Sequence, residues 1–271
     1  MKVSISNIAW RIEEEAAVAE LMARLGVRGV EVAPPKLGPD PAAWQPAVAR
    51  AYREFWSRHG VSIVAMQALL FGRPDLVLFG DDAQRAALLA YLEHVFRLGG
   101  RLGAGPMIFG SPKNRLAGDL PPEQARAIAV RFFRAAGDLA ARHGTCLCIE
   151  PNPREYGCDF ITTTRAARAL VRDVASPGFG LHVDAAALHM AGEGPEVLRE
   201  CGADIRHFHA SEPMLAQVEP GGAVDHAALA RTLRELRYAN WVSIEMRPHG
   251  DEVDHLPLVR ESLEFVTEVY G

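Results

Sequence analysis

The sequence predicts an α/β protein in which eight parallel strands close into one (β/α)8 barrel. Short β-type runs alternate with longer helical patterns from one end of the chain to the other, which is typical of consecutive βα units around a parallel sheet. Eight units share the 271 residues, so each takes about 34, which is close to the size of a barrel module. No shift in composition and no Ser/Gly-rich linker separates them. We therefore expect one domain that spans residues 1–271.

The expected strands are short runs of β-branched and other apolar residues bounded by turn residues. In chain order they read VSISNIA from Val3, GVEVA from Gly29, VSIVAMQ from Val61, PMIFG from Pro106, CLCIE from Cys146, GLHVD from Gly180, IRHFH from Ile205 and WVSIE from Trp241.

A helical pattern follows each strand, and several of these helices begin with Asp, Thr or Pro and end near Gly, as helix boundaries prefer. In chain order the expected helices are Glu13–Leu25, Ala42–His59, Asp82–Leu98, Pro122–His143, Thr163–Val174, Pro195–Glu200, Asp225–Leu236 and His255–Val269.

Alternate residues of the strands differ in polarity, as the two faces of a barrel strand should. The apolar set, expected to face the helices, is Val3, Ile5, Leu147, Ile149, Leu181, Val183, Val242 and Ile244. The polar set, expected to face the interior, is Ser4, Ser6, Cys146, Cys148, Glu150, His182, Asp184, Ser243 and Glu245. Its charged members lie at the carboxyl ends of strands, where barrel enzymes keep their chemistry.

The charge balance argues against two classes of partner. Lys and Arg number 29 and Asp and Glu 34, a net charge of 29 − 34 = −5, so no basic field attracts nucleic acid or anionic lipid. The longest stretch without ionisable residues, Gly60 to Gly72, is too short to span a membrane, and the first residues lack the apolar segment of a signal peptide. We therefore expect a cytoplasmic protein without nucleic-acid or membrane partners.

The four cysteines are expected to be reduced. They show no CxxC pair, and two of them stand only two residues apart along one strand, where a disulfide is hard to form. They are Cys146, Cys148, Cys158 and Cys201.

Four consecutive strands end in residues that bind metals: Glu150, Asp184, His209 and Glu245. They are 34, 25 and 36 residues apart in sequence, about one module each, so their side chains should meet at one side of the barrel mouth. Three carboxylates in one place repel one another unless a cation neutralises them. One strand-end acid by itself would more simply cap a helix or pair with an arginine, but four in succession favour a metal site.

Oxygen-rich ligation with one imidazole suits Mn²⁺ best, followed by Mg²⁺, and is compatible with Co²⁺, Fe²⁺ or Zn²⁺. His182 and His207 should lie one layer deeper in the barrel, where they would be buried imidazoles hydrogen-bonded to their neighbours and would orient a ligand as outer-sphere residues.

A second group of residues is placed to contact a substrate. Asn7, Trp10, Glu31 and Gln67 follow or end the first three strands. The aromatic Trp10 is interpreted either as cover for a sugar face or as packing.

The remaining substrate-contact candidates come from later loops. Lys113 and Arg115 follow the fourth strand and would bind a phosphate or carboxylate, or else form a solvated surface loop. His189 follows the sixth strand. Arg247 follows the eighth and is expected to bind substrate or to pair with the metal carboxylates. Tyr156 and Cys158, in the loop after the fifth strand, are left open as cover for the pocket.

The strings SNIAW, GVEVAP, IEPNP, LHVD, HFHASE and SIEMRP resemble the xylose-isomerase-like TIM-barrel superfamily in its sugar phosphate isomerase/epimerase branch, which includes relatives of D-tagatose 3-epimerase. The resemblance covers essentially the whole chain. It implies that Glu150, Asp184, His209 and Glu245 bind one divalent ion and that Glu150 and Glu245 are the catalytic acid/base pair. It departs at Ala187, where the ketose epimerases have a substrate-binding histidine, and in the loop SEPMLAQVEPGG, which lacks their arginine.

The expected function is therefore a metal-dependent isomerase or epimerase of a small carbohydrate or sugar phosphate that transfers protons through an enediolate. Three alternatives stay open. They are a metal-dependent dehydratase of a cyclic polyol ketone, a hydrolase like the apurinic-site endonucleases, and a sugar-binding barrel without catalysis. Gln67 and Gly110 stand where the endonuclease reading would want further histidine ligands. A homodimer is a further expectation for a barrel with exposed helices.

Overall fold

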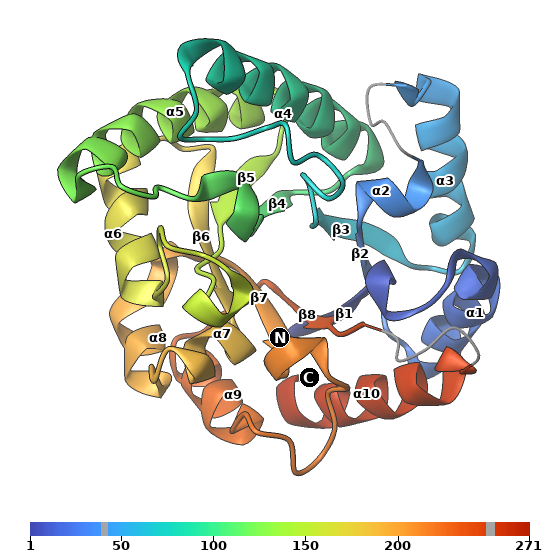
Figure 1. Ribbon diagram of the computed structural model, residues 1–271. Coiled ribbons are helices and arrows are strands. Elements are labelled where there is room, and N and C mark those ends of the chain that lie inside the picture. The colour runs from blue at the N-terminus through green and yellow to red at the C-terminus, as the bar shows by residue number, and fades with distance from the viewer. Residues whose placement is uncertain (39–42, 248–252) are drawn as a thin grey trace.

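Eight parallel strands form a closed barrel in the order β1 to β8, which confirms the predicted fold class (Figure 1). The computed structural model describes residues 1–38, 43–247 and 253–271. The strands are β1 Lys2–Ser6, β2 Gly29–Val32, β3 Ser62–Met66, β4 Pro106–Phe109, β5 Cys146–Ile149, β6 Phe179–Asp184, β7 Ile205–Ser211 and β8 Trp241–Glu245. Pairing of β1 with β8 closes the sheet on itself.

Most helices surround the barrel on its outer side, and the short α2 Pro34–Leu37 and α7 Ala185–Met190 follow the carboxyl ends of β2 and β6 (Figure 1). The outer helices are α1 Glu15–Leu25, α3 Pro46–Arg58, α4 Asp82–Leu102, α5 Pro122–Arg142, α6 Thr164–Val174, α8 Pro195–Cys201, α9 His226–Glu235 and α10 His255–Tyr270. Short 3-10 helices lie in the loops: η1 Asn7–Ala9, η2 Ile12–Glu14, η4 Pro112–Arg115, η5 Arg154–Tyr156, η6 Gly202–Asp204 and η7 Pro213–Leu215.

The helix predictions were correct in place but not at every boundary. α4 continues four residues beyond the predicted end at Leu98 and stops at Gly103, which adopts a φ of +88°. Gly99 does not end the helix. It allows close packing instead, because a Cβ there would lie 2.7 Å from the Sδ atom of Met107.

The other differences are short. The predicted first strand is shorter than expected, since residues 7–9 form η1. The helices α2 and α7 were not predicted. The predicted start of the second helix at Ala42 lies outside the described residues, and the corresponding helix α3 begins at Pro46.

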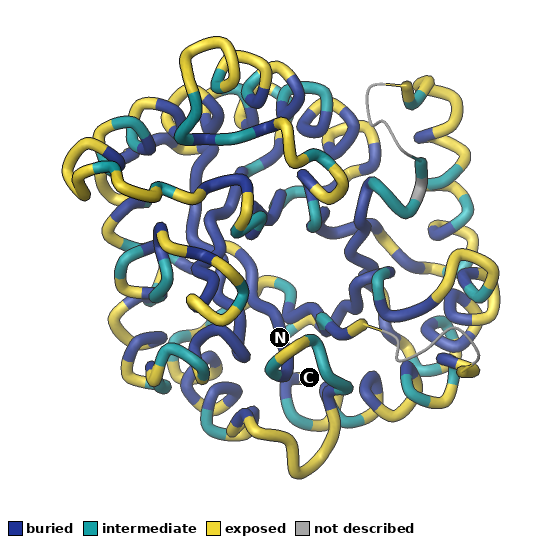
Figure 2. The backbone as a smooth tube through the Cα atoms, in the orientation of Figure 1, coloured by how far each residue is buried: buried dark blue, intermediate teal, exposed yellow. Residues whose placement is uncertain are grey.

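The outward face of the sheet and the inner faces of the helices form one apolar core, which includes every residue of the predicted apolar set. Figure 2 shows this burial along the strands, while the outer faces of the helices are exposed. The interior of the barrel is different, because several fully buried residues there are polar. They are Ser4, Ser6, Glu31, His182, His207, His209 and Ser243.

Strand register sets the height of each inward side chain. His182 pairs with His207, and one step higher Asp184 pairs with His209. Glu245 pairs with Ser211, two residues beyond His209 on β7. The inward groups of β6 to β8 therefore rise toward the mouth, with Glu245 highest.

In the part of the chain that the structure describes, we find no helix with the length and hydropathy needed to cross a bilayer. All four cysteines are free thiols, as expected.

Candidate metal centre

Asp184 lies at the junction of β6 and α7, where it has two tasks. Its Oδ1 caps α7 by accepting a hydrogen bond of 2.7 Å from the backbone N–H of Ala187. Its Oδ2 accepts a hydrogen bond from the hydroxyl of Ser211 and lies 3.8 Å from Nδ1 of His209. The helix cap thus fixes the carboxylate and directs its second oxygen at the neighbouring strand.

His209 on β7 is the centre of the cluster. Its Nδ1 lies 3.4 Å from Oε2 of Glu245, 3.7 Å from Oε1 of Glu150 and 3.8 Å from Oδ2 of Asp184. These separations exceed normal hydrogen bonds, and the buried Nδ1 has no hydrogen-bond partner. Atoms that share one ion at metal–ligand distances of about 2.1 Å are themselves separated by about 3 to 4 Å.

One group of possible donor atoms includes a residue beyond the predicted four, His182. Single ligand atoms of Glu150, His182, Asp184 and His209 all lie within 4.8 Å of one another. His182 contributes because its Nε2 lies 3.3 Å from Oε1 of Glu150. Glu245 does not belong to this set and approaches the cluster through His209, which follows from its higher place in the register.

The carboxylates of this cluster are electrostatically unfavourable without a cation. Burial, together with the charges of Glu245 and Glu150, raises the pKa of Asp184 to about 7. Burial also raises the pKa of Glu150, although the charge of His209 acts in the opposite direction. A cation at this place would favour the ionised forms. The donor set and the orphaned Nδ1 of His209 therefore fit a divalent ion.

Glu31, at the carboxyl end of β2, contacts the far side of the His209 ring. Its Oε2 and Oε1 lie 3.0 and 3.2 Å from Nε2 of His209. Burial would raise the pKa of Glu31, but the charges of His209 and His207 outweigh it and hold the pKa well below the usual value. Burial likewise opposes the charged form of His209, yet Glu31 and Glu245 raise its pKa well above the usual value.

His182 and His207 do lie one layer below Asp184 and His209, as their pairing shows. The expectation that both would be hydrogen-bonded to neighbours is wrong, because neither nitrogen of either ring has a hydrogen-bond partner. The rings stack on each other instead, with centroids 5.4 Å apart. Nε2 of His182 lies 3.3 Å from Oε1 of Glu150, and Nε2 of His207 lies 3.5 Å from Oε2 of Glu31.

Arg115 was predicted to bind a substrate anion or to lie in a solvated loop, but it is buried. Its side chain is fully buried and donates to backbone carbonyls, to Gly110 over 2.8 Å and Glu150 over 2.7 Å, and also to Phe160 and Ile161. It therefore ties the ends of β4 and β5 to the following loop and has no free donor face for a substrate anion. Its sequence neighbour Lys113 is exposed.

The other predicted substrate contacts divide into exposed and buried residues. His189 on α7 and Arg247 after β8 are exposed. No ion pair joins Arg247 to a carboxylate among the residues with described positions, so the expected pairing with the metal ligands is absent there.

Residues after the first strands are held by the protein itself. Asn7 accepts a hydrogen bond of 2.8 Å from the backbone N–H of Ala33, and Gln67 donates one of 2.6 Å to the hydroxyl of Ser6. Trp10 is 1% exposed and packs edge-on against Trp56, so it is a packing residue rather than cover for a sugar.

Tyr156 in η5, which the sequence left open as cover for the pocket, lies near the clustered carboxylates. The ring is half-buried, and its hydroxyl accepts a hydrogen bond of 2.9 Å from the backbone N–H of Met214. Burial raises the pKa of Tyr156, and the nearby charges of Asp184, Glu245 and Glu150 add to the rise. The available signal in the sequence is an aromatic residue in the loop directly after Glu150.

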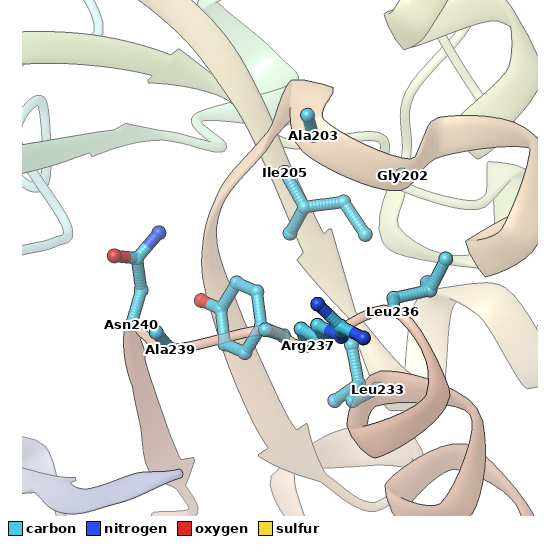
Figure 3. Close-up of a pocket in the computed structure, with 9 residues that line it drawn as sticks. Gly202, Ala203, Ile205, Leu233, Leu236, Arg237, Ala239 and Asn240 are labelled. Atoms are coloured by element: carbon cyan, nitrogen blue, oxygen red, sulfur yellow. The ribbon is translucent and has the colours of Figure 1, made fainter.

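A cavity of about 280 Å³ lies at the opposite end of the barrel, at the amino ends of β7 and β8 (Figure 3). Its lining is Gly202, Ala203, Ile205, Leu233, Leu236, Arg237, Tyr238, Ala239 and Asn240. None of the clustered carboxylates or histidines lines it, so it has no part in the chemistry of the mouth.

Comparison with known proteins agrees with this geometry. A family model described as xylose isomerase-like TIM barrel matches residues 19–269. A search of curated proteins gave no match.

Several solved sugar epimerases have the same fold. A D-psicose 3-epimerase solved with D-fructose superimposes with a TM-score of 0.83 at 19% identity over 100% of both chains. A D-psicose 3-epimerase from Clostridium cellulolyticum H10, solved with D-tagatose, gives 0.83 at 15% identity over 100% of this chain and 99% of that chain. A 3-keto-D-glucoside 4-epimerase from E. coli gives 0.79 at 18% identity over 99% of each chain.

Proposed function

Because the chain belongs to the xylose isomerase-like TIM barrel family, whose model matches residues 19–269, we propose that it is a divalent-metal-dependent isomerase or epimerase of a small carbohydrate. The observation that carries the proposal is the meeting of three carboxylates around Nδ1 of His209 at 3.4 to 3.8 Å. The similarity of the fold to several sugar epimerases supports the same class of reaction.

Glu150, Asp184, His209 and Glu245 would hold the ion, with Mn²⁺ as the first candidate. When bound, a divalent ion supplies Lewis acidity that makes the C–H next to a sugar carbonyl easier to deprotonate. Asp184 and His209 are the fixed members, since Asp184 is held by the α7 cap and His209 by Glu31.

Glu150 and Glu245 are the proposed acid/base pair. Glu150 directly follows β5 and Glu245 ends β8. Because β6 and β7 lie between these strands, the two carboxylates approach the centre from different directions. One carboxylate removes the proton from carbon to give an enediolate, and the other returns a proton. Both retain partial exposure, 12% for the side chain of Glu150 and 13% for that of Glu245, which leaves them accessible to substrate.

We further propose that the substrate differs from that of the ketose 3-epimerases. The solved relatives act on D-psicose and 3-keto-D-glucosides by their names. In this chain Ala187 is buried in α7, so no side chain there can hydrogen-bond a sugar hydroxyl. We therefore expect a substrate preference that differs from that of the ketose 3-epimerases.

Metal analysis and a substrate panel test the proposal. Protein purified without oxygen is analysed for bound metals, and the Mn²⁺-loaded protein is incubated in D2O with ketopentoses, ketohexoses, 3-keto-glycosides and their phosphates. Deuterium incorporation at carbon with an unchanged molecular formula supports isomerase or epimerase activity. Loss of water would assign the dehydratase instead, and the absence of exchange with every member would count against catalysis of this class.

A further inference from the structure

Glu31 is a buried carboxylate that contacts His209 on the side of the ring opposite the candidate metal ligands. Glu31, His207 and His209 are each fully buried. Oε2 of Glu31 lies 3.0 Å from Nε2 of His209 and 3.5 Å from Nε2 of His207. A buried carboxylate is costly unless it accepts hydrogen bonds or meets positive charge, so this position requires a proton on Nε2 of His209.

The two ring nitrogens of His209 have different roles. A neutral imidazole carries its proton on one nitrogen and a lone pair on the other. Since a carboxylate can only accept, Glu31 keeps the proton at Nε2, and the lone pair falls on Nδ1. That is the nitrogen that faces Glu150, Asp184 and Glu245.

We propose that Glu31 is a positioning residue that fixes His209 in the tautomer and ring orientation needed to bind the metal through Nδ1. The inference rests on the proposed function and deepens it, because it names a group on β2 that controls the affinity of a site built from β5 to β8. Carboxylates that accept the second N–H of a metal-bound histidine are a general means of fixing such a ligand.

A second cation between Glu31, His207 and His209 is the competing account, because ligand atoms of these three also lie within 4.8 Å of one another. With the first site filled, that arrangement would use both nitrogens of His209 as lone-pair donors, which requires removal of both ring protons. A hydrogen bond from Nε2 to Glu31 requires no such step, so the geometry favours one ion and one acceptor.

Mn²⁺ affinity, measured by competition with a chelator, provides the first test on the full chain. Glu31→Leu removes the acceptor and is expected to weaken binding about 10- to 100-fold. Glu31→Gln keeps an acceptor oxygen without the charge, so its loss should be smaller. Glu14→Gln is the matched control, because Glu14 makes an equivalent contact of 2.8 Å with His255 away from the centre, and its Mn²⁺ affinity should equal that of the wild type.

The tautomer provides a readout that loss of stability alone would not change. In the Zn²⁺-loaded protein with ¹⁵N-labelled histidine, the wild type should show a downfield, exchange-protected N–H at Nε2 of His209. The signal should disappear in Glu31→Leu and shift in Glu31→Gln. A wild-type His209 with its proton at Nδ1 would contradict the inference.

The outcomes separate the inference from the proposed function. If the wild type binds one Mn²⁺ and both Glu31 variants bind it equally well, the inference fails while the proposed function stands. Two Mn²⁺ ions per chain, reduced to one in Glu31→Leu, would assign the second cation site instead. A wild type that binds no divalent ion would overturn both.

Discussion

The two halves of the barrel end their strands in different ways. The strands β5 to β8 lead into Glu150, Asp184, His209 and Glu245, which crowd together and leave Nδ1 of His209 without a hydrogen-bond partner. At the ends of β1 and β3, Asn7 and Gln67 hydrogen-bond within the protein. Unmet polar groups alone do not separate the two halves, because Nδ2 of Asn7 and Nε1 of Trp10 also lack hydrogen-bond partners. The difference is charge: among the described residues, only in the second half do three carboxylates surround one imidazole nitrogen, and such a group favours a cation.

The largest expected effect concerns the proposed acid/base pair. Glu150→Gln and Glu245→Gln should each reduce deuterium exchange into the substrate by about 10²- to 10⁴-fold, since each removes a proton-transfer group. The measurement is exchange in D2O with the sugar that the panel identifies, together with circular dichroism to verify folding. Glu235→Gln, an exposed carboxylate paired with Arg199, is the control. Wild-type exchange in either test variant would end the acid/base assignment for that residue.

Metal content should fall when the fixed ligands are changed. Asp184→Asn and His209→Asn are expected to purify with less than about a tenth of the wild-type metal, because each loses a donor of the centre. Elemental analysis against protein concentration measures this, with Asp173→Asn, an exposed acid paired with Arg126, as the control. An unchanged stoichiometry would remove that residue from the ligand set and weaken the contrast between the two halves.

Replacement of Arg115 tests whether its hydrogen bonds to backbone carbonyls stabilise the fold. Arg115→Met leaves buried carbonyls of Gly110, Glu150 and Phe160 without donors, and the free energy of unfolding should fall by about 3 kcal/mol. Urea denaturation measures the loss, and the exposed Arg131→Met should change little. If Arg115→Met were as stable as the wild type, the buried guanidinium would need another explanation.

The pH dependence of the metal-free protein follows from Asp184. In the unfolded chain Asp loses its proton near pH 3.8, whereas in the folded protein Asp184 does so at about 7. Between these values the folded state binds more protons, so this contribution to stability is full below pH 3.8 and is lost as the pH rises to about 7. The Tm of the wild type should therefore fall by a few degrees over this range relative to Asp184→Asn. A parallel pH dependence in the two proteins would contradict the raised pKa.

The smallest effects are expected at the exposed candidates. Lys113→Ala, His189→Ala and Arg247→Ala should change KM for an uncharged sugar by less than about fivefold, because exposed charges contribute little. Steady-state kinetics measures this. A much larger rise in KM for a sugar phosphate in Lys113→Ala would instead show that the first half of the barrel contributes a phosphate contact.

Sequence reasoning identified the barrel, the order of its units and the inward polar residues, because each of these follows from local patterns. A strand alternates with period two and a helix follows the chain for many residues, so both leave a signal in a short window. The spacing of about one module then placed Glu150, Asp184 and His209 on adjacent strands, and the structure brings these side chains together.

Sequence by itself thus determined which side chains face inward and at which strand ends they stand. Only the tertiary structure decided that His182 approaches Glu150, that Glu245 sits higher than its neighbours, that Glu31 meets His209, and that Arg115 turns inward to the backbone. The physical reason is that the stagger of paired strands and the paths of the loops set these distances, and both depend on residues far apart in the chain.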